Sequence, residues 1–226
     1  FDYIKRLRII MAQFAVIGLG SFGATVALEL TRLNHDVIGI DTIKRNVESI
    51  ADKITHAVIA DATDEHVLDE LNLQNCEAVV VAIGEDIEAS ILCVLNLKNL
   101  GISKILAKTK TKAHHTILSH LNITKIIHPE EDMGVRVAQA LNYPMVSRYM
   151  ELDHDHYIIK VPVHEKLNKV NLSGILKQEP HIKLLLLKRN EQIIYEIDSS
   201  FTLQTGDVVI LEGLLIHLKK LSGCFL

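Results

Sequence analysis

A strand, a glycine turn and a helix follow one another directly in residues 14–23, Phe-Ala-Val-Ile-Gly-Leu-Gly-Ser-Phe-Gly. Phe14 to Ile17 form a continuous apolar run, which is typical of a strand buried on both faces of a parallel sheet. The glycines follow the pattern G-x-G-x-x-G, and residues 24–33 carry apolar side chains at helical spacing. This order predicts an α/β fold of the Rossmann type.

Each glycine of this turn has a separate expected role. Gly18 permits the tight turn, Gly20 lets a phosphate group approach the backbone, and Gly23 lets the helix pack closely on the strand. The helix N-terminus offers unpaired N–H donors and a positive dipole end to phosphates. The pattern therefore predicts a mononucleotide or dinucleotide site, and the alternative is a glycine turn that binds nothing.

Asp41 is the second anchor of the predicted site. It ends the apolar strand expected over residues 35–41, about twenty residues beyond the glycines. An acidic side chain at this distance reaches the hydroxyl groups of a ribose. The alternative role of Asp41 is to cap the helix that follows it.

Strands and helices continue to alternate up to about residue 142. Six strands alternate with six helices over about 130 residues, so the default topology is a doubly wound parallel sheet of order 3-2-1-4-5-6. The remaining strands are expected at residues 56–60, 77–84, 104–109 and 125–129, and the helices after the first at 43–52, 65–73, 85–100, 113–121 and 133–141.

Further candidates lie at the carboxyl ends of these strands, where ligands of open α/β sheets bind. Asp61 follows the third strand, as a ligand contact or as a turn and capping residue together with Thr63 or Asp64. Lys108 can face a phosphate group or remain solvated. The acidic run 130–132 precedes the helix expected at 133–141, where capping is its first interpretation and cation binding its second.

Composition excludes several other classes of function. The chain has 226 residues, a hydrophobic content of 48% and a net charge of −4, which gives no electrostatic footprint for nucleic acid. Its three cysteines lack C-x-x-C spacing and are expected to be reduced in the cytosol. No apolar run is long enough to cross a bilayer, so a link to a membrane is expected to go through a partner. Met11 is typical of a chain start, which makes residues 1–10 an expected extension.

The sequence changes character beyond residue 142. We expect a nucleotide-binding domain at 13–142, a connector at 143–150 and a small α+β domain at 151–226. Asn190-Glu191 predicts a hairpin turn between two strands of this last domain. Its strands are expected at 157–161, 183–189, 192–195, 201–203 and 208–213, and its helices at 170–176 and 214–221.

This pair of domains resembles the KtrA/TrkA family, the cytosolic regulatory subunits of bacterial potassium uptake systems. In that family a Rossmann-like RCK domain precedes a small C-terminal domain. The resemblance spans about residues 13–223, nearly the whole chain. It rests on residues 13–20 (QFAVIGLG), 78–84 (AVVVAIG), 126–134 (IIHPEEDMG), 185–189 (LLLKR) and 206–213 (GDVVILEG).

The resemblance implies a switch that is not an enzyme. Such subunits form homodimers and then octameric rings beneath an integral-membrane potassium transporter subunit of the KtrB/TrkH kind. The chain would then be cytoplasmic and peripheral at the inner face of the cell membrane. ATP favours the active form of similar proteins and ADP the inactive one. The rival expectation, an NAD(P)-dependent oxidoreductase, needs a catalytic acid or base and a substrate pocket in residues 151–226, which offer no polar group at convincing spacing.

The resemblance also implies a set of binding residues. By this resemblance, Asp41 is expected to hold the ribose. Glu130 is expected to help hold Mg²⁺ or another cation beside the terminal phosphates at the dimer interface. The cofactor-binding positions are Gly18, Gly20, Ser21, Phe22, Gly23, Asp41, Asp61, Ala62, Thr63, Ala82, Ile83, Gly84, Lys108 and Glu130.

Ser21 departs from the family pattern. Close relatives commonly carry arginine at this position, directed at the γ-phosphate across the dimer. A neutral hydroxyl group cannot supply that charge-assisted contact. Selection of ATP over ADP is therefore open, and NAD or NADH, which some related subunits bind, gains weight. The C-terminal domain of some relatives binds cyclic di-AMP, a property that the sequence of this chain neither supports nor excludes.

Overall fold

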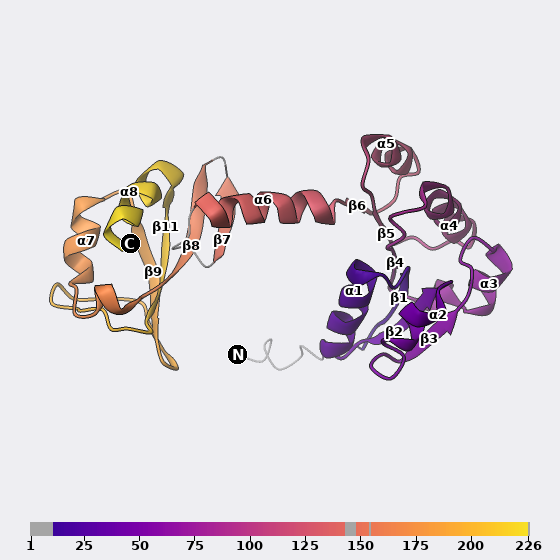
Figure 1. Cartoon of the computed structure of the whole chain (residues 1–226), viewed down its shortest axis with the longest axis horizontal. Coiled ribbons are helices and arrows are strands. Elements are labelled where there is room, and N and C mark those ends of the chain that lie inside the picture. The colour runs from indigo at the N-terminus through magenta and orange to yellow at the C-terminus, as the bar shows by residue number, and fades with distance from the viewer. Residues whose placement is uncertain (1–10, 143–147, 154, 226) are drawn as a thin grey trace, which may run out of the picture. The chain divides into compact units, whose positions relative to one another are not determined.

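The computed structural model describes residues 11–142, 148–153 and 155–225. Contacts between residues divide the chain into two compact units, Phe1–Asp132 and Met133–Leu226 (Figure 1). Helix α6 (Pro129–Asn142) begins in the first unit and continues into the second. None of the helices in the described ranges has the length and apolar content that a membrane span needs.

The first unit contains a six-stranded parallel sheet of order β3-β2-β1-β4-β5-β6, which confirms the expected doubly wound topology. The order reverses at β1, between β2 and β4, so the sheet has a topological switch point beside the glycine turn. The strands are β1 (Gln13–Ile17), β2 (Asp36–Asp41), β3 (His56–Ile59), β4 (Ala78–Val81), β5 (Ile105–Lys108) and β6 (Lys125–Ile127).

Helices cover both faces of this sheet. On one face, Val16 of β1 packs in a core with Ala27 of α1 and Val47 of α2. On the other face, Ile17 shares a core with side chains of α3, α4 and α5. Successive residues of the strand thus pack into the cores on opposite faces of the sheet, which explains the uninterrupted apolar run of β1. The helices are α1 (Ser21–Arg32), α2 (Lys44–Glu48), α3 (Glu65–Glu70), α4 (Ile87–Asn99) and α5 (Lys112–His120), with a 3₁₀ turn at Leu73–Asn75.

The second unit contains a five-stranded antiparallel sheet of order β10-β9-β11-β8-β7. Alternate residues of its strands, such as Ile159 and Leu211, pack against Leu172 of α7 and Leu218 of α8. The elements are β7 (Arg148–Asp153), β8 (His156–Pro162), a 3₁₀ turn (Glu165–Leu167), α7 (Leu172–Gln178), β9 (Lys183–Arg189), β10 (Gln192–Ile194), β11 (Val208–Leu214) and α8 (Leu215–Phe225).

Two expectations about the middle of the chain differ from the structure. Helix α6 begins at Pro129 rather than at Met133, so the acidic run 130–132 forms its first turn instead of preceding it. Proline suits this first position because its ring fixes φ and the N–H it lacks has no partner there. Strand β7 begins at Arg148, inside the expected connector 143–150, because residues 148–153 pair antiparallel with β8. Residues 143–147 of that connector lie outside the described residues.

The strand expected at 201–203 is not a regular strand. Thr202 forms one isolated bridge with Asn171, and the segment crosses the end of α7 rather than joining the sheet. The hairpin turn at Asn190-Glu191 is confirmed, because Arg189 of β9 pairs with Gln192 of β10 and Asn190 has a φ of 53°.

Candidate nucleotide-binding site

A cavity of about 600 Å³ opens at the carboxyl ends of the first unit's strands, at the topological switch point. Its size lies within the range of small-molecule and cofactor sites. Of the fourteen positions expected to bind a cofactor, twelve line this cavity and two do not, Gly23 and Glu130. The twelve are Gly18, Gly20, Ser21, Phe22, Asp41, Asp61, Ala62, Thr63, Ala82, Ile83, Gly84 and Lys108.

The three glycines of the turn have different surroundings. Gly18 has a φ of +90°, which favours glycine, and its N–H donates to the carbonyl oxygen of Ile40 over 2.8 Å. A Cβ atom on Gly23 would lie 1.8 Å from the carbonyl oxygen of Gly18, so Gly23 serves the packing of the helix. A Cβ atom on Gly20 would meet nothing within 4 Å. Gly20 is therefore the glycine that leaves open space at the cavity.

Helix α1 presents its N-terminus to the cavity. Gly20 is the N-cap residue, and no side chain caps the helix there. Its first backbone N–H groups thus keep their hydrogen-bonding capacity for an anion, supported by the helix dipole. Ser21 and Phe22 of the first turn also line the cavity, which places a neutral hydroxyl group and an aromatic ring beside these donors.

Asp41 is buried at the end of β2 and organises the glycine turn. One carboxylate oxygen accepts hydrogen bonds from the backbone N–H of Leu19 over 2.6 Å and from the side-chain amide of Asn46 over 3.0 Å. The other oxygen accepts from the N–H of Ile43 over 2.8 Å. Because Ile43 holds the N-cap position of α2, the carboxylate of Asp41 is not the cap of that helix. A carboxylate oxygen has more than one lone pair, so Asp41 retains acceptor capacity toward a ribose hydroxyl group.

The loop after β3 forms another wall. The carboxylate of Asp61 accepts from the N–H of Thr63 over 2.9 Å and from its hydroxyl group over 2.7 Å, and these bonds hold the pKa of Asp61 below its usual value. The N-cap of α3 is Asp64, so the capping role does not fall to Asp61. The side-chain amide of Asn96 in α4 donates to the carbonyl oxygen of Thr63 over 2.8 Å. The loop is thereby fixed from both sides.

Lys108 brings a positive charge to the cavity from the end of β5. Its side chain is only 11% exposed, and its ammonium nitrogen lies 2.7 Å from a carboxylate oxygen of Glu130. The same nitrogen lies 5.8 Å from the centre of the Phe22 ring. A Cβ atom on Gly84 would lie 3.2 Å from this nitrogen, so the glycine makes room for the lysine.

Glu130 stands beside the cavity rather than in its wall. It lies in the first turn of α6, and its side chain is 54% exposed. The hydrogen bond from Lys108 holds the pKa of Glu130 below its usual value. Mg²⁺ in nucleotide sites commonly uses one or two carboxylates together with phosphate oxygens. The described residues contain no cluster of three or more His, Cys, Asp or Glu placed for a metal, so a cation role of Glu130 stays a prediction.

Sequence reasoning missed the acidic wall that α4 contributes. Glu85, Asp86 and Glu88 line the cavity, together with Ala89 and Leu92. The carboxylate of Asp86 caps α4 by accepting from the N–H of Ala89 over 2.9 Å, and Glu85 pairs with Lys110. The sequence shows acidic residues at a helix start, but nothing local indicates that this helix start borders the glycine turn.

Sequence comparison gives this chain clear relatives. The profile of the TrkA-N domain matches residues 14–129. Ktr system potassium uptake protein A of Bacillus subtilis (strain 168) is 36% identical over 217 residues, which cover 96% of this chain and 98% of the relative. Ktr system potassium uptake protein C of the same organism is 34% identical, covering 92% and 95%. Ktr system potassium uptake protein A of Vibrio alginolyticus is also 34% identical, covering 89% and 92%.

Solved structures share the fold at low sequence identity. The RCK domain of GsuK superimposes with a TM-score of 0.61 at 14% identity, covering 95% of this chain. The GsuK channel bound to NAD gives 0.55 at 14% identity. This chain spans less than half the length of those two chains, 47% and 43%. The three relatives cover between 89% and 96% of this chain, and the chain therefore belongs to the Ktr family of potassium uptake proteins that carry a TrkA-N domain.

Proposed function

We propose that this chain is the nucleotide-sensing regulatory subunit of a potassium uptake system. The similarity to Ktr system potassium uptake proteins A and C extends over nearly the whole chain, including both structural units. The proposal that the chain binds a nucleotide rests on the cavity at the switch point. This cavity has the open space at Gly20 on one side and the buried carboxylate of Asp41 on the other.

The proposed ligands are ATP and ADP, or NAD and NADH. The ribose binds at Asp41, the adenine ring lies near residues 61–63, and the phosphates face the N-terminus of α1 and Lys108. The contacts of the cavity support this assignment, because Lys108 and the free N–H groups of α1 supply donors at one end. Residues 13–142 form the nucleotide-binding domain in this proposal, and residues 151–226 form the regulatory C-terminal domain.

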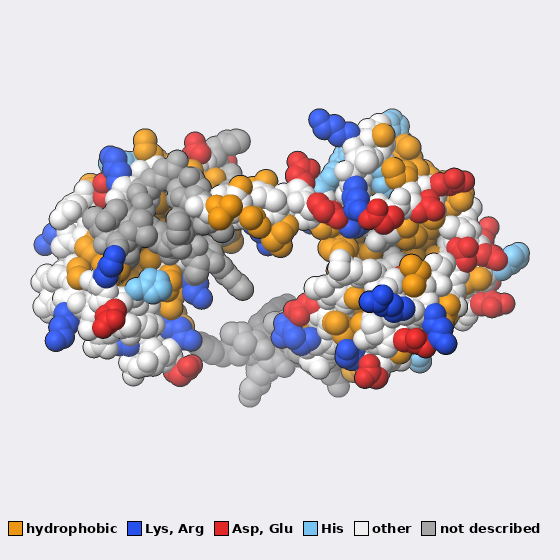
Figure 2. All heavy atoms as spheres, viewed as in Figure 1, with side chains coloured by type: hydrophobic (Ala, Val, Ile, Leu, Met, Phe, Trp, Pro, Cys, Tyr) orange, Lys and Arg blue, Asp and Glu red, His pale blue; other side chains and the backbone are white. Residues whose placement is uncertain are grey.

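The proposed partner is an integral-membrane potassium transporter subunit, and the chain acts from the cytoplasmic face of the membrane. In this proposal two copies of the chain form a homodimer, and homodimers assemble into an octameric ring. Exposed apolar side chains on α6 support self-association, and Figure 2 shows orange side chains along this helix. They are Met133, Val135, Val137 and Leu141, with exposed fractions between 51% and 77%. Apolar surface of this kind marks interaction sites.

The proposed mechanism is a shift between two shapes of the assembly. A nucleotide changes the balance only if it binds one shape more tightly than the other. The ring then transmits the favoured shape to the membrane subunit. In this proposal the chain performs no chemical step, and its ligand acts only through differential affinity.

An NAD(P)-dependent oxidoreductase is the alternative. It needs an acid or base beside a substrate. The second unit has a cavity of about 430 Å³, and its described lining includes neither a carboxylate nor a histidine. The lining residues are Lys160, Leu186, Lys188, Asn190, Ile193, Gly206, Val208 and Ile210. What favours the regulatory function over hydride transfer is the similarity to Ktr system potassium uptake proteins over nearly the whole chain.

Potassium uptake by membrane vesicles tests the proposal. Vesicles that contain the membrane subunit of the same system receive the purified chain with ATP, ADP, NAD, NADH or no nucleotide. We expect uptake rates that depend on the nucleotide with the wild-type chain and not with Asp41→Asn. Asp36→Asn is the matched control, because Asp36 begins the same strand away from the cavity and accepts a hydrogen bond from Thr55.

Two results would contradict the proposal. Identical uptake with every nucleotide and without the chain would overturn the regulatory function. Hydride transfer between the bound nucleotide and a substrate panel, measured by absorbance, would favour the oxidoreductase.

A further inference from the structure

We infer that Glu130 sets the charge specificity of the pocket by competing with ligand phosphates for the ammonium group of Lys108. This inference rests on the proposed function, because it concerns which adenine nucleotides the same pocket takes. In the absence of a divalent cation, the pocket favours a dinucleotide such as NADH, whose two phosphates are joined by an anhydride bond and carry one negative charge each, over ADP and, most strongly, over ATP.

The pocket has little positive charge to offer. Five carboxylates line it, and Lys108 is the one lysine or arginine among the described lining residues. Ser21, at the first position of α1, contributes a hydroxyl group and no charge. Two of the carboxylates, Asp86 and Glu88, belong to the start of α4 and have no cationic partner among the described ion pairs. A terminal phosphate therefore enters a region of excess negative charge.

Glu130 already neutralises this one ammonium group. The two charged groups are 2.7 Å apart, within the range of a charge-assisted hydrogen bond. A phosphate oxygen that approaches Lys108 must share or replace this carboxylate. Each additional charge on the ligand raises its repulsion from the carboxylate of Glu130, which holds the same nitrogen before the ligand arrives.

The burial of the two partners decides which one moves. Lys108 is 11% exposed and is confined by Gly84 and by the ring of Phe22. The side chain of Glu130 is 54% exposed and reaches the lysine from outside the cavity wall. A bound phosphate therefore displaces the carboxylate toward solvent, while the ammonium group stays in place. Glu130 lies in the first turn of α6. Binding of a ligand in the pocket therefore also changes the contacts of that helix.

The ligands differ in the charge that they bring to this point. Each phosphate of NADH is substituted on two oxygens and carries one negative charge, whereas a terminal phosphate group carries close to two at neutral pH. The penalty from Glu130 therefore rises from NADH to ADP to ATP. A divalent cation reverses this order, since it screens the phosphates and turns the nearby carboxylate into a favourable neighbour.

Calorimetric titration in EDTA tests the inference with Glu130→Gln and Glu131→Gln. Glutamine keeps the size of the side chain and removes its charge. Glu131 is the matched control, because it lies in the same helical turn and its carboxylate neighbours His128 instead of Lys108. NADH, ADP and ATP are the three ligands. Thermal unfolding of each variant checks that it is folded.

We expect Glu130→Gln to tighten ATP binding by roughly fivefold to tenfold, ADP binding by less, and NADH binding by the least, whereas Glu131→Gln leaves all three unchanged. An unchanged or weakened ATP affinity of Glu130→Gln in EDTA would overturn the inference. Wild-type binding that is tighter for ATP than for NADH in EDTA would also overturn it, while leaving the proposed function intact. If no nucleotide binds the wild type or either variant, the proposed function itself fails.

Discussion

The ammonium nitrogen of Lys108 and a carboxylate oxygen of Glu130 lie 2.7 Å apart, which joins the end of β5 to the first turn of α6. One partner lines the candidate pocket, and the other belongs to the helix that continues into the second unit. The pair is a direct physical connection between the pocket and α6. In the proposed mechanism, a bound nucleotide therefore first affects α6 at this ion pair.

Replacing Lys108 by glutamine should weaken the binding of every adenine nucleotide. The change removes the one ammonium group of the described pocket lining, and a hydrogen bond to a charged group contributes about 1.5–3 kcal/mol. Calorimetry measures the loss. Lys104→Gln is the control, because Lys104 precedes the same strand at its opposite end and pairs with Glu77. Equal affinities of the two variants would show that Lys108 does not contact the ligand.

The glycine turn separates a binding effect from a folding effect. Gly20→Ala should lower the free energy of unfolding by less than about 1 kcal/mol, because a Cβ atom there meets nothing within 4 Å. It should still weaken nucleotide binding, since the methyl group enters the space beside the N-terminus of α1. Gly23→Ala should lower the free energy of unfolding by about 1–3 kcal/mol or more, because its Cβ atom would lie 1.8 Å from a carbonyl oxygen.

Urea unfolding and nucleotide titration of the two glycine variants check this prediction together. A Gly20→Ala variant that binds nucleotide as tightly as the wild type would mean that the open space at this turn holds no phosphate. A Gly23→Ala variant of wild-type stability would contradict the packing role of that glycine.

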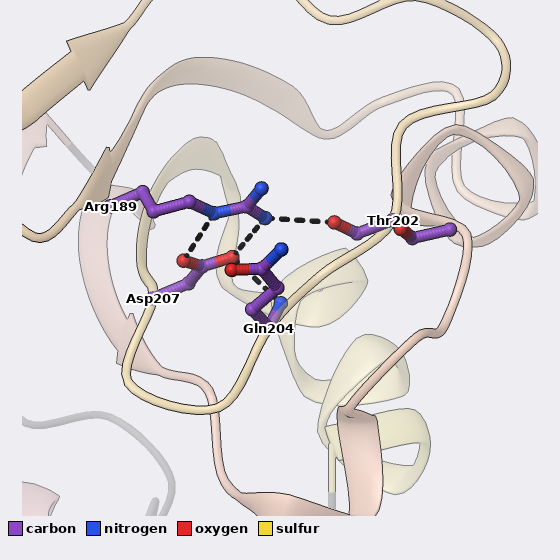
Figure 3. A network of polar contacts seen from close by, with 4 residues as sticks. All are labelled: Arg189, Thr202, Gln204 and Asp207. Atoms are coloured by element: carbon purple, nitrogen blue, oxygen red, sulfur yellow. Dashed lines mark hydrogen bonds and ion pairs between the residues drawn. The ribbon is translucent and has the colours of Figure 1, made fainter.

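The second unit contains an ion pair between Arg189 and the buried carboxylate of Asp207. The guanidinium group of Arg189 donates to both carboxylate oxygens of Asp207, over 2.9 and 2.7 Å, and to the carbonyl oxygen of Thr202 over 2.8 Å (Figure 3). The N–H of Gln204 donates to the same carboxylate over 2.8 Å. The pair thus ties the end of β9 to the turn that enters β11.

Arg189→Met should lower the free energy of unfolding of the second unit by about 3–5 kcal/mol, because it leaves the carboxylate of Asp207 buried without a cation. Hydrogen exchange of backbone amides in β9 and β11 measures this loss. Lys188→Met is the control, since its side chain is exposed on the same strand. Similar exchange rates in both variants would show that the ion pair contributes little.

The same network predicts a dependence of stability on pH. Burial alone would raise the pKa of Asp207, but the hydrogen bonds from Arg189 and Gln204 outweigh it and hold this pKa below its usual value. Because the folded pKa is lower than the unfolded one, the contribution is complete above about pH 4 and is lost as the pH falls through the folded pKa. Unfolding of the wild type and Asp207→Asn should differ most above pH 4 and converge in acid. A difference that grows in acid would contradict the assignment.

The succession of motifs along the sequence is enough to predict the glycine turn and Asp41, which form the centre of the site. The strand, the glycines and the helix are covalently adjacent, and Asp41 ends the next strand, so parallel pairing brings them together. The bond from the N–H of Leu19 to Asp41 follows only from the folded turn, since it joins residues 22 positions apart. The sequence therefore predicts the presence of the carboxylate but not its role in fixing the turn.

The periphery of the site depends on contacts that no local pattern encodes. Glu85 and Asp86 indicate a helix start in the sequence, and only the pairing of β4 with β1 places them at the cavity. The sequence pattern predicts Glu130 before a helix, whereas its place within the first turn of α6 depends on Pro129 as the first helical residue. Strand β7 cannot be predicted in this way, because the adjacent Tyr149 and Met150 interrupt the alternation of polar and apolar side chains, and this segment becomes a strand through its pairing with β8.

Calorimetric titration of the purified chain with NADH, ADP and ATP is the most direct test of the central claim. We expect saturable binding of at least one of them, weakened by Asp41→Asn at the cavity and unchanged by Asp36→Asn at the other end of the same strand. Absence of saturable binding for all three ligands, with and without Mg²⁺, would contradict the claim that the space between Gly20 and Asp41 is a nucleotide site.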